Sequence, residues 1–527
     1  MPGKVAAAKR VPVAMMTESN RTLPPAERAT KPGPTADASS LTTLGEEPLG
    51  PPTNPATAGD PEISPGQDLQ GGSGTCLFST MVASAPPRPA SNAASSPAVP
   101  PPTTQTLTNV EPPDETVITD LNFGGVVLVG VVGKPNVGKS TFFAAATLKD
   151  VPIADYPFTT IQPNVGVAHL KTQCVCKEMG VTDTPRNSAC VDGTRLIPVK
   201  IVDVAGLVEG ASKGKGLGNQ FLDDVRQADA LIQVVDASGS TDLEGRKVPP
   251  GTHDPVGDIA MVEHEFDLWM FGIIKKDWEK AARSLEQTGG KIVEHLAERL
   301  SGLSVTFGDV EQVVLHLHLR TEKPTAWTDE QIMQFVVETR KLTKPSLVAA
   351  NKADLPASRA NIETLKTTGR KIVPCASEAE LLLRKAAEHG LVQYTPGDPQ
   401  FIVRDPQKLT PAQTNALRMV EDKVMKTYGG TGVQDAINEA FFGLLSAIIV
   451  FPVEDETRLS DKEGRVLPDA FVMKGGSTAI DLARTVHSEL ADTFLYAVDA
   501  RTGKRLGSDH VLKNRDIVKI VSSGKRG

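Results

Sequence analysis

The chain has 527 residues, which is enough for two to four domains of roughly 100–200 residues each. Its 56 Lys and Arg residues against 64 Asp and Glu residues leave a formal net charge of −8, which excludes a histone-like polyanion binder but allows a local basic surface. Five cysteines are too few for a disulfide scaffold, and no apolar stretch approaches the ~18 residues that span a bilayer. We therefore expect a cytoplasmic protein with no membrane partner.

The first quarter of the chain has the composition of an unfolded segment. Residues 1–120 contain 21 of the 40 prolines and a single aromatic residue, Phe78. They show neither helical nor strand periodicity, so they cannot bury enough apolar surface to form a core. We expect a disordered leader over residues 1–124 that acts as a tether, a modification target or a dispensable tail.

Residues 125–400 have the pattern of an α/β fold. A β-branched run at 126–132 is typical of a strand buried on both faces, and a helix is expected over 140–149. Similar apolar runs lie at 198–202, 230–235 and 346–350, with helical stretches between them. Strands that alternate with helices predict a doubly wound, mostly parallel sheet.

Three further regions complete the expected organisation. Between residues 241 and 344, apolar residues such as Ile259, Val262 and Phe266 recur at helical spacing, which predicts a helical insertion. Residues 401–447 are expected to form a helical connector. Residues 448–523 predict a small mixed domain, with strands at 448–453, 494–498 and 517–521 and a single helix at 478–490.

A phosphate-loop pattern, G-x-x-x-x-G-K-[ST], lies directly between the first strand and the first helix. Backbone N–H groups of such a loop surround nucleotide phosphates, aided by the positive end of the helix that follows. Lys139 is expected to reach the terminal phosphates, and the Ser140 hydroxyl to ligate Mg²⁺. The predicted phosphate-binding residues are Gly133, Lys134, Pro135, Asn136, Val137, Gly138, Lys139, Ser140 and Thr141.

Two polar motifs follow later strands of the predicted sheet. In the D-x-x-G motif at 203–206, Asp203 can hold Mg²⁺ through water and Gly206 can donate its N–H to a γ-phosphate. In the N-K-x-D motif at 351–354, the Asp354 carboxylate can accept both the N1–H and the exocyclic amine of guanine, whereas adenine has no matching pair of donors. Asn351 would connect the surrounding loops and Lys352 would cover the base. These residues predict GTP as the substrate.

Several longer stretches are specific enough to compare with known proteins. They are DYPFTTIQPNVG at 155–166, CVCKEMG at 174–180, DVAGLVEG at 203–210, KGKGLGNQFL at 213–222 and LPDAF at 467–471. Together they resemble the Obg-type GTPases, in particular the YchF-related archaeal and eukaryotic branch with a C-terminal TGS domain. The resemblance covers residues 125–523 and implies a P-loop NTPase fold over 125–400, followed by a ubiquitin-like TGS domain over 448–523.

The resemblance also implies roles for individual residues. Thr160 would belong to a first switch and join the Mg²⁺ shell, and residues 203–219 would form the second switch. The catalytic residues would then be Lys139, Thr160 and Gly206. Ala376 and Ser377, where the family usually has Ser-Ala, would bring a backbone N–H to guanine O6. Proteins with a TGS domain are implicated in ribosome or RNA association, which implies a ribosome or structured RNA as partner.

Three functions stay open at this point. The first is a slow GTPase switch on the ribosome or RNA, because Leu207 stands where Ras-like enzymes have the glutamine that orients water. The second is an ATPase, since well-studied YchF members prefer ATP, although they have glutamate at the position of Asp354. The third is a non-catalytic interaction module that nucleotide stabilises. Asn136 also resembles the asparagine that holds K⁺ in cation-activated relatives, which predicts K⁺ near the β- and γ-phosphates.

Three cysteines form a candidate metal group. Cys174, Cys176 and Cys190 would be three zinc ligands, and the candidates for the fourth are Asp183, Asp192 and His169. A structural zinc site usually shows C-x₂₋₄-C spacing and four nitrogen or sulfur ligands. The single residue between the first two cysteines and the missing fourth cysteine therefore favour free thiols.

Basic residues gather near the end of the chain. Such a surface suits contact with a phosphate backbone, and a merely solvated face is the alternative. Few aromatic residues lie among them, so base stacking on a single strand is not expected. The basic residues are Arg501, Lys504, Arg505, Lys513, Arg515 and Lys519.

Overall fold

The computed structural model describes residues 127–147, 164–204, 206, 210 and 225–523. The expected leader at 1–124, Thr160, Leu207 and the glycine-rich stretch at 213–222 lie outside these residues. Among the described helices, none combines the length and the apolar composition that crossing a membrane requires.

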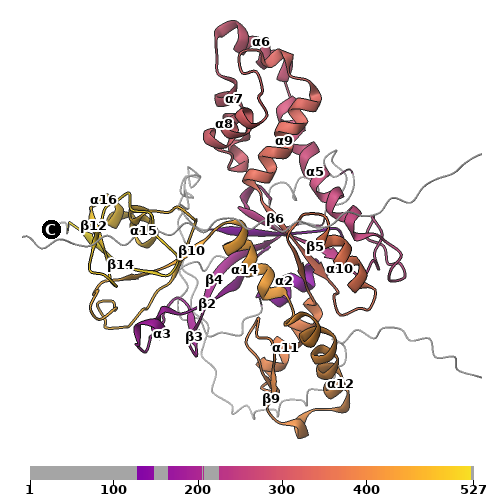
Figure 1. The fold of residues 1–527 in the computed structure, drawn as a ribbon, viewed down its shortest axis with the longest axis vertical. Coiled ribbons are helices and arrows are strands. Elements are labelled where there is room, and N and C mark those ends of the chain that lie inside the picture. The colour runs from indigo at the N-terminus through magenta and orange to yellow at the C-terminus, as the bar shows by residue number, and fades with distance from the viewer. Residues whose placement is uncertain (1–126, 148–163, 205, 207–209, 211–224, 524–527) are drawn as a thin grey trace, which may run out of the picture. The chain divides into compact units, whose positions relative to one another are not determined.

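The central sheet confirms the predicted α/β class (Figure 1). Over the described residues it has seven strands in the order β2-β4-β1-β5-β6-β7, with β3 paired to β4. Neighbours from β4 to β7 along this order run parallel, whereas β2 and β3 run antiparallel to β4. The strands are β1 Leu128–Val132, β2 Val165–Gln173, β3 Ala189–Val191, β4 Thr194–Asp203, β5 Ala230–Asp236, β6 Ser346–Asn351 and β7 Ile372–Pro374.

Both faces of this sheet are covered by helices, as continuous β-branched strands require. Val129 and Val131 of β1 belong to a core with α2 (Lys139–Thr147) and α14 (Val433–Asn438). Val132 and its partly buried neighbour Leu128 belong to a second core with α5 (Pro255–Lys275) and α9 (Asp329–Thr343). A third core joins β5 and β6 to α5 and α10 (Ser358–Lys366). The carboxyl ends of the parallel strands are therefore supported by helices packed on both faces of the sheet.

The region between β5 and β6 is helical from α5 to α9. The helices between them are α6 Trp278–Thr288, α7 Ile292–Leu300 and α8 Phe307–His316. The first part of this region, up to residue 254, is a loop in which Thr241 pairs with Lys247. Asp254 ends that loop by capping α5, whose first residue is Pro255, a residue suited to the first helical position.

Residues 377–444 contain helices and one short ribbon. The ribbon joins β8 (Val392–Gln393) to β9 (Ile402–Val403). The helices are α11 Ser377–Glu388, α12 Pro411–Val420, α13 Lys426–Tyr428 and α14, with π-helical turns at Glu421–Met425 and Glu439–Leu444. A core of α11, α12 and the ribbon holds this part together.

A five-stranded sheet closes the chain, in the order β11-β10-β14-β12-β13 over the described residues. Its strands are β10 Ile448–Val453, β11 Phe471–Met473, β12 Phe494–Asp499, β13 Arg505–Leu506 and β14 Asp516–Ser522. The expected strands are thus present, but the single helix at 478–490 is wrong. Two helices occur there, α15 Ala479–Val486 and α16 Ser488–Asp492, because His487 between them is extended, with φ −165° and ψ 134°.

Candidate functional site

The phosphate loop between β1 and α2 depends on two glycines that have no room for a side chain. Gly138 has a φ of +92°, and a Cβ at this position would lie 2.3 Å from Asn351 Nδ2. A Cβ on Gly133 would lie 2.5 Å from the carbonyl oxygen of Val234 in β5. The two glycines therefore let the loop approach the neighbouring strand ends closely.

Lys134 is part of the loop but its side chain is buried and turned away from solvent. Its Nζ donates to Asp258 Oδ1 at 2.7 Å and to the carbonyl of Thr241 at 3.0 Å. His253 Nε2 lies 2.7 Å from the same Asp258 oxygen, and burial raises the pKa of the Asp258 carboxyl. Lys134 thus fixes the loop to α5. Because its ammonium is engaged, only its backbone N–H is available to contact phosphates.

Lys139 and Asp203 meet at the carboxyl end of the parallel strands. Lys139 Nζ donates to Asp203 Oδ1, and both side chains are partly exposed. Ser140, the second residue of α2, is exposed. Gly206 lies against the loop, since a Cβ there would be 3.6 Å from Pro135 Cγ. The predicted phosphate and Mg²⁺ groups therefore share one edge of the sheet.

Asn351, at the end of β6, links three loops through one buried amide. Its Nδ2 donates to the carbonyl of Val137 at 3.0 Å. Its Oδ1 accepts from the backbone N–H of Ser377 at 3.1 Å and from the Ser377 hydroxyl at 2.8 Å. The amide thereby joins the phosphate loop, the 351–354 motif and the start of α11.

The other residues of the 351–354 motif differ in their partners. Lys352 Nζ donates to Asp236 Oδ2 at 2.8 Å and to Ser240 Oγ at 3.1 Å, so its ammonium is held at the end of β5. Burial raises the pKa of the Asp354 carboxyl, and the Glu378 charge adds to this. Within the described chain, Asp354 accepts no hydrogen bond from another residue, so its oxygens are available for a ligand.

Ala376 and Ser377 occupy the turn into α11, with both backbone donors engaged. The Ala376 N–H donates to the carbonyl of Thr431 at 2.8 Å, while the Ser377 N–H donates to Asn351. A guanine O6 at this place would have to share or replace one of these bonds. Ser377, the second of the two residues, also donates its hydroxyl to Asn351.

The loop before α5 covers the phosphate loop, a contact that the sequence patterns did not indicate. Asn136 is exposed and has a φ of 64°, and its Nδ2 donates to the carbonyl of Gly245 at 2.8 Å. Gly245 has a φ of +80°, and a Cβ there would come within 2.8 Å of the Pro135 carbonyl oxygen. The glycine in an otherwise polar, charged turn was the one available signal of this close approach.

Comparisons with known proteins agree with this geometry. Family models match residues 128–253 (50S ribosome-binding GTPase), 349–455 (Obg-like GTPase YGR210-like, G4 motif-containing domain) and 464–522 (TGS domain). A GTP-binding protein of Methanocaldococcus jannaschii is 48% identical over 402 residues, which are 76% of this chain and 100% of that protein.

Two other proteins extend the comparison. The crystal structure of a GTP binding protein from Pyrococcus horikoshii OT3 is 42% identical, covers 75% of this chain and 100% of that chain, and has a TM-score of 0.60. The ribosome-binding ATPase YchF of Bacillus subtilis is 34% identical over 208 residues, which are 37% of this chain and 54% of that protein. On the matched motifs, the fold and the full-length archaeal relative, the chain belongs to the Obg-type GTPase family, in its YchF-related archaeal and eukaryotic branch with a C-terminal TGS domain.

Proposed function

We propose that the protein binds GTP with Mg²⁺ and hydrolyses it slowly, as a nucleotide switch that acts on the ribosome or structured RNA. The observation that carries the choice of base is the Asp354 carboxylate, which is half-buried beside the Asn351–Ser377 contact and takes no bond from another described residue. A carboxylate in that position matches the two donors of guanine and opposes the N1 acceptor of adenine.

The groups at the phosphate end of the site have two proposed roles, phosphate binding and Mg²⁺ binding. Lys139 would leave Asp203 and bind the β- and γ-phosphates, and the Gly206 N–H would donate to the γ-phosphate. Ser140 and Asp203 fit an Mg²⁺ shell because both offer oxygen ligands at this edge. The ion would supply positive charge to the phosphates. Thr160 completes the proposed shell from outside the described residues.

A potassium ion near Asn136 belongs to the same proposal. The Asn136 side chain stands at the open face of the loop, held through its Nδ2 by Gly245, which leaves the amide oxygen as a ligand for a cation. We expect faster turnover in K⁺ than in Na⁺ buffer. Equal rates in the two buffers would remove K⁺ from the mechanism.

The first test is a titration of the protein with fluorescent GTP, GDP and ATP analogues in Mg²⁺ buffer. We expect guanine nucleotides to bind at least tenfold more tightly than ATP, a difference of about 1.4 kcal/mol. Asp354→Glu should reduce that preference. Equal or tighter binding of ATP would instead favour the ATPase alternative, with the base pocket reshaped at Ala376 and Ser377.

The proposed partner rests on the TGS domain and on the name of the Bacillus subtilis relative, a ribosome-binding ATPase. A switch should cosediment with ribosomes or bind structured RNA differently when loaded with GTP and with GDP. If both loaded forms bind equally and no phosphate is released, the chain is the third alternative, a nucleotide-stabilised interaction module.

A further inference from the structure

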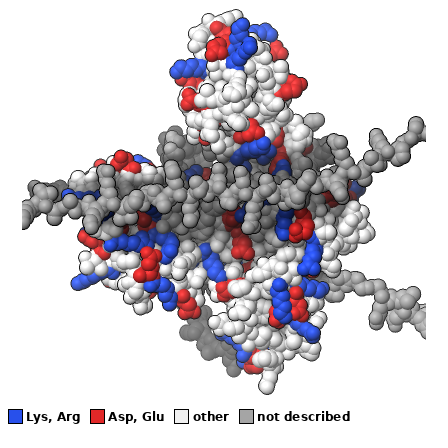
Figure 2. All heavy atoms as spheres, viewed as in Figure 1, with Lys and Arg blue, Asp and Glu red and all other residues white. Residues whose placement is uncertain are grey.

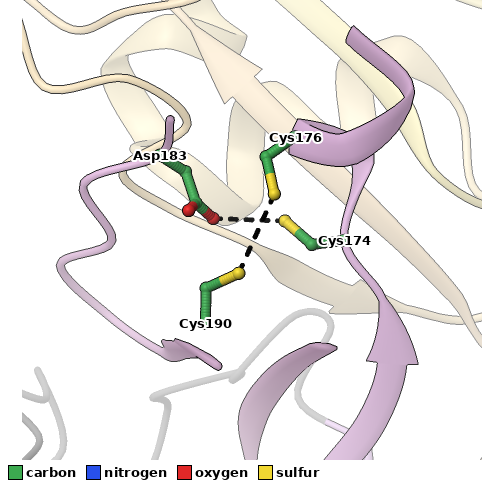
Figure 3. A group of neighbouring side chains, drawn as sticks. All are labelled: Cys174, Cys176, Asp183 and Cys190. Carbon is green, nitrogen blue, oxygen red and sulfur yellow. Dashed lines mark hydrogen bonds between the residues drawn. The ribbon is translucent and has the colours of Figure 1, made fainter. Parts of the chain in front are cut away.

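A cluster of three cysteines and one aspartate lies outside the nucleotide site, in the chain segment that connects β2 to β4, and has no role in the proposed function. Cys174 caps α3 (Val175–Met179), Cys176 lies within α3, Asp183 follows in the loop and Cys190 is in β3. Figure 3 shows the four side chains pointing toward one another. The sulfur atoms and one carboxylate oxygen all lie within 4.8 Å of each other. Of the candidates for a fourth ligand, Asp183 joins the cysteines, and Asp192 and His169 do not.

The spacing of these atoms approaches that of a tetrahedron around zinc. Bond lengths of about 2.3 Å for sulfur and about 2.0 Å for oxygen give tetrahedral edges of ~3.8 Å between two sulfurs and ~3.5 Å between sulfur and oxygen. Cys176 Sγ and Cys190 Sγ are 3.9 Å apart, and Cys174 Sγ is 3.2 Å from Asp183 Oδ2. All the separations are at most 4.8 Å, so changes of about 1 Å in them would place four ligands on one ion.

Neighbouring groups hold the cluster as they hold ligands in metal sites. The fully buried Arg195 donates to Asp183 Oδ2 at 2.7 Å and is itself fixed by Ser188 Oγ at 2.8 Å. Such outer contacts orient the ligands before the ion binds.

A reactive or redox-active cysteine explains the cluster less well. Nucleophilic and redox cysteines lie in partly exposed, electropositive surroundings, whereas Cys174 is fully buried and its sulfur lies 3.2 Å from the Asp183 carboxylate. Two of the three thiols are buried, and the four described cysteines are all free of disulfide bonds. Three sulfur ligands and one oxygen ligand suit Zn²⁺, a borderline-soft ion with tetrahedral preference.

The geometry points to a structural Zn²⁺ site formed by Cys174, Cys176, Cys190 and Asp183. Four protein ligands leave no open position for a substrate. The ion would fix the loop between α3 and β3, which pairs with the C-terminal part of the chain: the Thr184 N–H donates to the Val466 carbonyl at 2.8 Å, and the Arg186 N–H to the Pro468 carbonyl at 2.7 Å. Zinc would thereby stabilise the junction between the nucleotide-binding part and the TGS domain.

The test is the metal content of the full chain purified without chelators. We expect about one zinc per chain by mass spectrometry, and the intense absorption of tetrahedral thiolate-bound Co²⁺ after exchange. Cys174→Ser and Cys190→Ser should each lower the zinc content at least tenfold. Cys375→Ser is the matched control, because Cys375 is as buried as Cys174, lies outside the cluster and donates to the Val373 carbonyl, a bond that serine can keep.

A thiol count under denaturing conditions without reductant gives a readout that does not depend on folded variants. Five titratable thiols together with one zinc support the site. Three thiols, which would indicate one disulfide, or five thiols in a chain that takes up neither Zn²⁺ nor Co²⁺, would overturn it. None of these results depends on nucleotide binding, so the proposed GTPase function is tested separately.

Discussion

Two lysines of the same loop have opposite roles because their environments differ. The Lys134 side chain is 1% exposed and paired with Asp258, which is 3% exposed. The Lys139 side chain is 12% exposed and paired with Asp203 at an accessible edge. A buried charge depends on its partner, whereas a partly exposed charge is free to change partners when a ligand arrives.

This contrast predicts different effects of two equal substitutions. Lys134→Met should lower the free energy of unfolding by about 3–5 kcal/mol, because it leaves the Asp258 carboxylate buried without its cation. Lys139→Met should change it by about 1 kcal/mol or less but should abolish tight nucleotide binding. Urea denaturation and nucleotide titration of both variants measure the two effects. Similar losses of stability would contradict the division of roles.

His169 in β2 predicts a dependence of stability on acid pH. Burial, and secondly the Arg384 charge, lower the pKa of His169 to about 4, and its Nε2 has no partner among the described residues. The unfolded chain therefore binds the proton more readily than the folded chain between pH 6.5 and 4. Above pH 6.5, His169 is neutral in both states and does not lower the free energy of unfolding. Below pH 6.5, protonation of the unfolded chain lowers that free energy progressively until the pH reaches about 4.

The expected loss is about 3 kcal/mol of unfolding free energy for a pKa difference of this size. Because other groups titrate in the same range, the measurement is the difference between the wild type and His169→Gln from pH 7 to pH 4. The variant should lose less stability on acidification. Parallel curves for the two proteins would refute the assignment.

At the scale of elements, Arg195 of β4 connects two distant segments. Besides Asp183 and Ser188, its guanidinium donates to the carbonyls of Leu467 at 2.8 Å and Pro468 at 3.3 Å. Its charge also lies 5.7 Å from the centre of the Phe451 ring. Each nitrogen of the guanidinium thus has at least one partner, and the side chain is fully buried.

Arg195→Met should therefore lower the free energy of unfolding by about 3–5 kcal/mol, because Asp183 and two carbonyls lose a buried donor. Hydrogen exchange should become faster at residues 466–470. Arg283→Met is the control: Arg283 pairs with Glu279, and the side chains of both are largely exposed, at 69% and 78%, so the expected cost is about 1 kcal/mol or less. Equal costs would show that burial does not decide the effect.

At the scale of the molecule, one apolar core extends from the central sheet to the C-terminal sheet. It contains Val129 and Val131 of β1 as well as Phe451 of β10 and Ile517 of β14. A nucleotide that shifts the site at the end of β1 acts on a frame that continues into the TGS domain. In the proposed switch, this continuous core would connect a change at the nucleotide site to the TGS domain.

Ion pairs with acidic residues reduce the number of basic residues that are available for the expected basic surface near the end of the chain. Lys and Arg atoms are interspersed with Asp and Glu atoms on the described part of the face in Figure 2. Arg501 and Arg515 both pair with Glu178 of α3, and Lys519 pairs with Glu456. Lys504, Arg505 and Lys513 are exposed and remain as candidates for contact with phosphates.

Lys504→Glu combined with Lys513→Glu should weaken binding to structured RNA or ribosomes at least tenfold at low salt, with a smaller effect at high salt. Lys280→Glu, which changes an exposed charge in α6 of the helical region between β5 and β6, serves as a control. Filter binding at two salt concentrations measures the effect. If the double variant binds as well as the wild type, the TGS domain contacts its partner through another face.

Much of the fold could be predicted because it depends on patterns formed by residues close together in the chain. The run of β-branched residues that forms β1 is typical of a strand buried on both faces. The spacing of the glycines and Lys139 is typical of a phosphate loop between a strand and a helix. The split helix at His487 could not be predicted, since residues 478–490 keep an apolar periodicity on both sides of the break.

The sequence by itself determined the P-loop architecture, the N-K-x-D motif after a buried strand and the presence of a small C-terminal domain, because residues close together in the chain suffice for each of these. Only the tertiary structure decided that Asp258 pairs with Lys134 across 124 residues, that Asn351 reaches Val137 across 214, and that Asp183, rather than His169, joins the three cysteines. The first two contacts depend on how the strands are ordered in the sheet, which no local spacing encodes, and the third depends on the path of the loop between α3 and β3.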